Sequence, residues 1–190
     1  SAAVGGSNMP EHGSRVTFFP AQTYGPSSTV ISDLDSFTVG INAAQFVFNT
    51  YDRYGNSREV GGDTFSFVVT CVENSKQVPA VYRDLANSSY AVQFSPTISG
   101  AYTIEARVVT TRSHAQGDAI ISISGADSLL EGRILQSTVL PGPLHVPSCT
   151  LSGPGILGST AGVDGLVTIQ GRDQYSNRRS TDDGSFYFNL

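Results

Sequence analysis

The sequence predicts an all-β protein built as an antiparallel sandwich, in one complete copy followed by a partial second copy. Apolar residues alternate with a period of two along most apolar stretches, which is typical of half-buried strands. No segment sustains a helical period. A pattern of strand, turn and strand also recurs with a shift of 121 residues, from Asp52 to Asp173.

Each alternating run predicts one strand. The runs are Phe46 and Phe48; Phe65, Phe67 and Val69; Tyr90, Val92 and Phe94; Tyr102, Ile104, Ala106 and Val108; and Ile121 and Ile123. Because side chains two positions apart share a face of a strand, we expect one core from the first four runs. Its expected members are Phe46, Phe48, Phe65, Phe67, Tyr90, Val92, Tyr102 and Ile104.

Turn-forming residues separate these runs, at positions 52–56, 61–63, 87–89 and 99–100. The best helical candidate, residues 126–135, is short and contains a glycine. Several short strands at this spacing favour a sandwich or barrel over a helical fold.

The internal repeat aligns residues 46–69 with residues 167–190 without a gap. The aligned pairs include Asp52 with Asp173, Tyr54 with Tyr175, Asn56 with Asn177, Arg58 with Arg179, Phe65 with Phe186 and Phe67 with Phe188. Upstream, the tripeptide 24–26 resembles 152–154, which implies about seven extra residues in the first copy. We interpret these residues as specifying the same sandwich twice rather than as a duplicated active site.

The motifs resemble those of filamin-type immunoglobulin-like repeats over nearly the whole chain after residue 14. The matching segments are D-R-Y-G-N at 52–56, G-G-D-T-F at 61–65, S-Y-A-V-Q-F-S-P at 89–96, G-A-Y-T-I at 100–104, L-P-G-P at 140–143 and L-S-G-P-G-I-L at 151–157. The resemblance implies an immunoglobulin-like antiparallel β-sandwich. Such repeats occur in filamins and in plant or algal gamete and protist surface proteins.

We therefore expect three parts: a flexible N-terminal segment at 1–13, a filamin-type repeat at 14–142, and an incomplete second repeat at 143–190. A segment near 110–124 looks like an insertion, such as an extended hairpin. The second copy supplies about three strands, too few to cover its apolar face. We expect the chain to be a fragment of a longer array, with strands donated by another chain as the alternative.

Composition argues against several function classes. The net charge is −5 with no basic cluster, which argues against a nucleic-acid partner, and no apolar stretch suggests contact with a membrane. His12, His114 and His145 are scattered, and no nucleophile, base or ligand set clusters in the sequence. We expect no catalytic residues, no metal and no cofactor. The carboxylates in turns, such as Asp52, are expected to bind their own backbone amides rather than calcium.

Two features leave alternatives open. Cys71 and Cys149 could be free thiols or one disulfide. Asn87 begins the only N-x-S/T acceptor sequence, so it is a candidate glycosylation site if the protein is secreted.

The expected function is that of a non-catalytic structural or adhesion module from a multi-repeat protein, acting as a rod-like scaffold or a cell-surface interaction array. Its expected partners are other protein chains or neighbouring repeats. The alternatives are a cytoskeletal or ciliary scaffold that binds extended peptides by strand addition, and an accessory repeat of a larger enzyme. Low charge and a single lysine favour an extracellular or cell-surface location.

The resemblance also implies a peptide groove between the third and fourth strands, here residues 64–71 and 78–84. The candidate edge residues are Thr64, Ser66, Val68, Val78, Ala80 and Val81.

Overall fold

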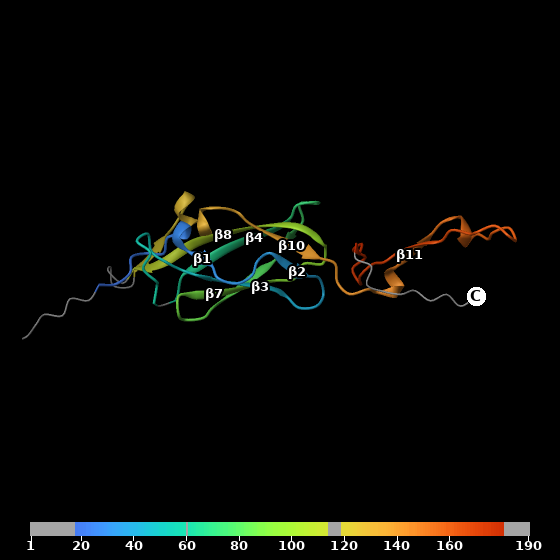
Figure 1. Ribbon diagram of the computed structural model, residues 1–190. Coiled ribbons are helices and arrows are strands. Elements are labelled where there is room, and N and C mark those ends of the chain that lie inside the picture. The colour runs from blue at the N-terminus through green and yellow to red at the C-terminus, as the bar shows by residue number, and fades with distance from the viewer. Residues whose placement is uncertain (1–17, 60, 114–118, 181–190) are drawn as a thin grey trace, which may run out of the picture.

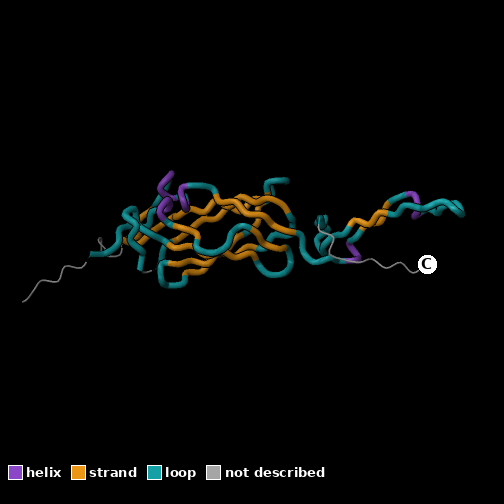
Figure 2. The backbone as a smooth tube through the Cα atoms, in the orientation of Figure 1, coloured by secondary structure: helices purple, strands orange, loops and turns teal. Residues whose placement is uncertain are grey.

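The computed structural model describes residues 18–59, 61–113 and 119–180 and contains a β-sandwich followed by a slender extension (Figure 1). We call residues 18–142 the sandwich and residues 143–180 the C-terminal extension. Strands and loops dominate both parts, and the helical segments are short 3-10 turns (Figure 2). The predicted all-β class is confirmed.

One sheet of the sandwich has four strands in the order β1-β3-β7-β6, all antiparallel. Its strands are β1 (Thr29–Val30), β3 (Ala44–Asn49), β6 (Ala80–Asp84) and β7 (Ser89–Phe94). β3 and β7 pair along their whole length, from Ala44 opposite Phe94 to Asn49 opposite Ser89. The two strands carry the predicted alternating runs at 46–48 and 90–94.

The other sheet has the strand order β2-β10-β8-β4-β5, with β9 pairing to the far part of β8. Its strands are β2 (Ser36–Thr38), β4 (Thr64–Cys71), β5 (Gln77–Val78), β8 (Gly100–Ser113), β9 (Ala119–Ser122) and β10 (Leu135–Leu140). The pair of β2 with β10 is parallel, which is the one departure from the antiparallel pattern in the described residues. Together, the two sheets have the strand grouping of an immunoglobulin-like sandwich.

The core between the sheets contains the predicted residues. Phe46, Phe48, Phe65, Tyr90, Val92, Tyr102 and Ile104 are buried, and Phe67 is half-buried against them. Phe48 stacks on Tyr90 at a ring-centroid distance of 5.5 Å, and Phe65 lies edge-on to Tyr90 at 4.6 Å. The alternation therefore identified both inward faces correctly.

The segment expected as an insertion belongs to a long hairpin. β8 continues to Ser113, and β9 returns beside it with Thr110 opposite Ser122. After β9 the chain forms two 3-10 turns, η3 (Gly125–Ser128) and η4 (Leu130–Gly132), in the region of the best helical candidate. The fully buried Leu130 packs into the core from this segment.

The C-terminal extension leaves the sandwich after β10 and carries a two-stranded ribbon of β11 (Thr150–Ser152) and β12 (Thr168–Gln170). Three-residue 3-10 turns, η5 (Val146–Ser148) and η6 (Pro154–Ile156), flank β11. Leu151 in β11 exposes 57% of its surface, and Leu157 and Leu166 beside the ribbon expose 95% and 68%, so the described residues give this region little apolar cover. Phe186 and Phe188 lie outside them.

Contacts in the sandwich recur in the extension with the same shift of 121 residues. Thr29 pairs with Asn49, as Thr150 does with Gln170. The turns η1 (Gly25–Ser27) and η5 are also 121 residues apart. The amide of Tyr24 donates to the carbonyl oxygen of Tyr51, and the amide of His145 donates to that of Arg172.

The alignment with a shift of 121 residues therefore extends back without a gap to residue 21, which aligns with residue 142. The amides of both residues donate to the aligned carboxylates of Asp52 and Asp173. The alignment matches Tyr24 with His145, whereas the sequence comparison had matched the tripeptide 24–26 with 152–154. No extra residues separate turn and strand in the first copy.

Candidate functional site

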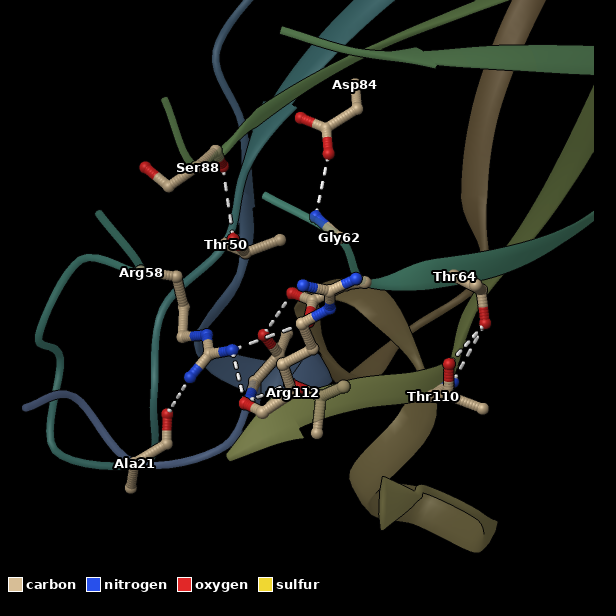
Figure 3. A network of polar contacts seen from close by, with 12 residues as sticks. Ala21, Thr50, Arg58, Gly62, Thr64, Asp84, Ser88, Thr110 and Arg112 are labelled. Carbon is tan, nitrogen blue, oxygen red and sulfur yellow. Dashed lines mark hydrogen bonds and ion pairs between the residues drawn. The ribbon is translucent and has the colours of Figure 1, made fainter. Parts of the chain in front are cut away.

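A buried arginine joins the chain at Ala21 to the end of β8 at Arg112 (Figure 3). Arg58 is 1% exposed, and its Nη1 donates to the carbonyl oxygen of Ala21 at 2.6 Å. Its Nη2 donates to the carbonyl oxygen of Arg112 at 2.6 Å and lies 3.5 Å from Asp63 Oδ1. One guanidinium thus fixes three separate segments, as its rigid set of donors allows.

Asp63 continues this network into the core. Its Oδ2 accepts a hydrogen bond from the hydroxyl of Thr23 at 2.5 Å, and its backbone amide donates to the hydroxyl of Tyr90 at 3.1 Å. Burial, and secondarily the negative charge of Asp63, raise the pKa of Tyr90 above its ordinary value. Because the side chains of Arg58 and Asp63 are fully buried, the pair is structural and cannot meet a substrate.

The turn at residues 52–56 is organised by one carboxylate. Asp52 Oδ1 accepts hydrogen bonds from the amides of Tyr54 and Asn56, both at 2.9 Å. Its Oδ2 accepts from Asn56 Nδ2 at 2.9 Å and from the amide of Ala21 at 3.0 Å. Burial alone would raise the pKa of Asp52, but these hydrogen bonds outweigh it and lower the pKa. The amides of Tyr54 and Asn56 belong to the turn itself, as the sequence predicted, whereas the amide of Ala21 comes from outside it.

The turn at residues 173–177 has the same internal bonding. Asp173 Oδ1 accepts from the amides of Tyr175 and Asn177, both at 2.9 Å. Its Oδ2 accepts from Asn177 Nδ2 at 2.7 Å and from the amide of Gly142 at 2.8 Å. Arg179 Nη1 donates to the carbonyl oxygen of Gly142. The second turn therefore holds the end of the sandwich as the first holds Ala21.

The second turn also contacts the sandwich directly. Asn177 Nδ2 donates to the carbonyl oxygen of Thr97, and Asn177 Oδ1 accepts from the amide of Ser99, both at 3.0 Å. A Cβ placed on Gly40 would lie 2.8 Å from the Nε2 of Gln174, so glycine permits this close approach. We call residues 39–40 and 97–99 the receiving loops.

Gly142 lies at the centre of this junction. A Cβ at this position would come within 2.6 Å of the carbonyl oxygen of Val39, so a larger residue would push the receiving loops away. Sequence reasoning did not find this junction. The signal that could have found it was the repetition of Asn56 and Arg58 at 177 and 179, which marks positions with a shared structural role.

The predicted peptide edge is split between the two sheets. Thr64, Ser66 and Val68 lie on the exposed face of β4, whereas Val81 is exposed on β6 in the opposite sheet. Val78 belongs to the short β5, and Ala80 begins β6. The range 78–84 expected as one strand is therefore two strands that pair with different partners.

Tyrosine hydroxyls occupy part of the β4 edge that faces β6. The amides of Asp63 and Phe65 donate to the hydroxyls of Tyr90 and Tyr82, at 3.1 and 3.4 Å. β5 covers only the end of β4, with Val69 opposite its Val78. An added strand would have to pair in the interval around Phe67.

The glycosylation candidate lies on the turn between β6 and β7. Asn87 is exposed, but its Oδ1 accepts a hydrogen bond from the amide of Ser89 at 3.3 Å. The acceptor side chain is therefore accessible, and glycosylation there remains a prediction.

In the described residues, no three His, Cys, Asp or Glu side chains gather as a metal site would require. His145 Nδ1 lies 2.8 Å from Ser148 Oγ, while His12 and His114 lie outside those residues. Cys71 and Cys149 are both free, which decides between the two alternatives for the thiols. No helix among the same residues is long and apolar enough to cross a membrane.

Comparison with known proteins supports the fold. No protein-family model and no curated protein matches the sequence. Among solved structures, invasin, a bacterial integrin-binding protein, matches 84% of the chain at 12% identity with a TM-score of 0.56. The Escherichia coli adhesin FdeC matches 83% at 16% identity (TM-score 0.53), and Yersinia pseudotuberculosis InvD matches 86% at 16% identity (TM-score 0.50).

The chain spans only 29% of the invasin structure, 44% of FdeC and 46% of InvD. At these identities the likeness shows a shared immunoglobulin-like sandwich architecture. It agrees with the class of fold that the filamin-type motifs predicted.

Proposed function

We propose that the chain is a non-catalytic structural module of an adhesin-like rod, in which immunoglobulin-like repeats follow one another end to end. The proposal divides the chain into a first repeat ending at residue 142 and a second repeat beginning at residue 143. The main support for the proposal is the contact between the two units, which we call the junction. There the second turn is hydrogen-bonded both to Gly142 and to the receiving loops.

Two further features support a load-bearing role. The junction follows a linker with prolines at 141, 143 and 147, which restrict backbone rotation between the units. The most prominent charged pair of the sandwich, Arg58 with Asp63, is buried and used for structure. An adhesin-type setting is supported by the architecture shared with FdeC, invasin and InvD.

The test is the stiffness of the junction in the 190-residue chain. Residual dipolar couplings from residues 18–142 and 168–179 should fit one alignment tensor. Asn177→Ala, which removes both bonds to the receiving loops, should separate the two tensors. Asn74→Ala, on an exposed turn of the sandwich, is the matched control. Independent tensors in the unmodified chain would contradict the rod.

A second candidate function is peptide binding by strand addition at the β4 edge, with Thr64, Ser66 and Val68 flanking the added strand. The pairing of β5 with only Val69 and Thr70 favours it, because the edge of β4 around Phe67 is covered neither by β5 nor by the tyrosine hydroxyls at Asp63 and Phe65. Chemical-shift changes at residues 64–68 on titration with an extended peptide would test it.

A further inference from the structure

The first turn presents the same groups as the second turn but makes no contact with receiving loops. Tyr54 exposes 78% of its surface, whereas its counterpart Tyr175 exposes 45%. Asn56 is exposed and Asn177 is half-buried. The described residues show no hydrogen bond to Asn56 Oδ1, the atom whose counterpart in Asn177 binds the amide of Ser99.

The first turn is already set in the conformation that docks. Asp52 holds Asn56 through its Nδ2, as Asp173 holds Asn177, at 2.9 and 2.7 Å. Both turns use positive φ at the fourth position, with +82° at Gly55 and +68° at Ser176. Docking the first turn would therefore cost little reordering of its side chains.

The sequence just before the first turn's repeat, at 17–21, resembles the sequence at the end of that repeat, at 138–142. Thr-Phe-Phe-Pro-Ala at 17–21 corresponds under the 121-residue shift to Thr-Val-Leu-Pro-Gly at 138–142, where β10 ends. Val139 is 1% exposed in β10, whereas its counterpart Phe18 is 88% exposed. Phe18 thus has the position of a last-strand residue without a sandwich around it in the described residues.

We propose that residues 52–56 dock onto the receiving loops of a repeat that precedes this one in the same chain. This inference rests on the proposed function and adds a specific interaction surface to it. Asn56 Oδ1 accepts a hydrogen bond from a backbone amide of the preceding repeat's receiving loops, and Asn56 Nδ2 donates to a backbone carbonyl there. Tyr54 packs beside these loops. A second copy of the chain cannot supply its own receiving loops, because Asn177 already occupies them.

One residue sets a condition on the partner. Beside the first turn, Ala21 occupies the position that aligns with Gly142. A Cβ added at Gly142 would lie 2.6 Å from the carbonyl oxygen of Val39. The preceding repeat must therefore leave room for one methyl group. The first turn has Arg53 where the second has Gln174. The guanidinium carbon of Arg53 lies 5.4 Å from the ring centre of Tyr24. Both residues line a pocket of about 440 Å³.

The experiment uses a duplicated chain in which a first copy, ending at residue 142, is joined directly to residue 22 of a second copy that runs to residue 190. This joint keeps Gly142 and brings residues 52–56 of the second copy to the first copy's receiving loops. Amide hydrogen exchange is followed by NMR at the two Ser99 positions. Both amides should be protected, and Asn56→Ala in the second copy should speed exchange about five-fold at one of them only. Asn177→Ala should expose the other.

Fast exchange of the first Ser99 in the folded duplicated chain would overturn the inference, while protection of the second would still support the rod. If the duplicated chain does not fold, Gln174→Arg with Ser176→Gly in the 190-residue chain decides. This variant converts the second turn to the sequence of the first. Retained protection of Ser99 supports the inference, and protection lost to the level of Asn177→Ala overturns it.

Discussion

The guanidinium of Arg58 lies 3.5 Å from the carboxylate of Asp63, and neither side chain is exposed to solvent. The pair also makes hydrogen bonds with Ala21, Arg112 and Thr23, while Arg58 Nε and Asp63 Oδ1 are buried without a hydrogen-bond partner among the described residues. A buried ion pair of this kind is tolerated only because its charges find partners. It fixes the chain at Ala21 and Thr23 to the rest of the sandwich.

Arg58→Met should lower the free energy of unfolding by about 3–5 kcal/mol, because it leaves the buried Asp63 carboxylate without its charge partner. Urea denaturation of the 190-residue chain measures this change. Arg83→Met, at an exposed position of β6, is the control and should change stability by less than about 0.5 kcal/mol. Equal effects of the two variants would contradict a structural role for Arg58.

Asp52→Asn should destabilise the chain by about 1–3 kcal/mol at pH 7, since it removes a charged acceptor of four hydrogen bonds. The pKa of Asp52 is lowered in the folded state, so its contribution is complete above the ordinary pKa of 3.8. That contribution is lost as the pH falls through the lower folded pKa. Acid titration of stability should therefore be shallower in Asp52→Asn than in the unmodified chain.

Phe48→Ala should cost about 3–5 kcal/mol, because Phe48 is fully buried between Phe65 and Tyr90. Thermal and urea unfolding give the value. Val81→Ala, which truncates a side chain that is 65% exposed, should be close to neutral. A loss below about 1 kcal/mol for Phe48→Ala would show that the aromatic cluster is not the core.

Tyr82→Phe should speed hydrogen exchange at the amide of Phe65, because it removes the hydroxyl that this amide contacts at 3.4 Å. Global stability should change little, since the aromatic ring stays in place. NMR exchange rates at Phe65 and at Val108, which lies opposite Phe65 on β8, provide the comparison. Unchanged exchange at Phe65 would indicate that the hydroxyl does not cap the β4 edge.

The ribbon of β11 and β12 should be weakly protected in the monomeric 190-residue chain. Two strands without an apolar cover are marginally stable, and Leu151 in β11 is 57% exposed. Hydrogen exchange at 150–152 and 168–170 should be much faster than in β3 and β7. Protection equal to that of the core strands would show that the ribbon is self-sufficient.

The sequence was most informative where side chains alternate. Phe46, Phe48 and Ile104 were assigned to the core correctly, because a period of two follows directly from strand geometry. The division of residues 77–84 into β5 and β6 was missed, since pairing to different sheets leaves no trace in alternation. Pro79, which separates the two strands and cannot donate to a ladder, was the available signal.

Tertiary roles were harder to predict than strands. Arg58 and Asn177 are ordinary surface residues by type, and only the recurrence of Arg58 at 179 and of Asn56 at 177 pointed to a shared role. The upstream match was misplaced because glycine and proline in 152–154 resemble 24–26 more closely than 145–147 do. The correct alignment is shown by the equivalent backbone hydrogen bonds of Tyr24 and His145, which do not depend on the identity of the side chain.

The free state of Cys71 and Cys149 has a mechanical consequence. No covalent crosslink limits how far a repeat can be drawn out when its ends are pulled apart. A segment of one repeat length, the shift from Asp52 to Asp173, would reach roughly 400 Å when fully extended. In the rod proposed above, each repeat would therefore unfold and lengthen under tension before the covalent backbone is stretched.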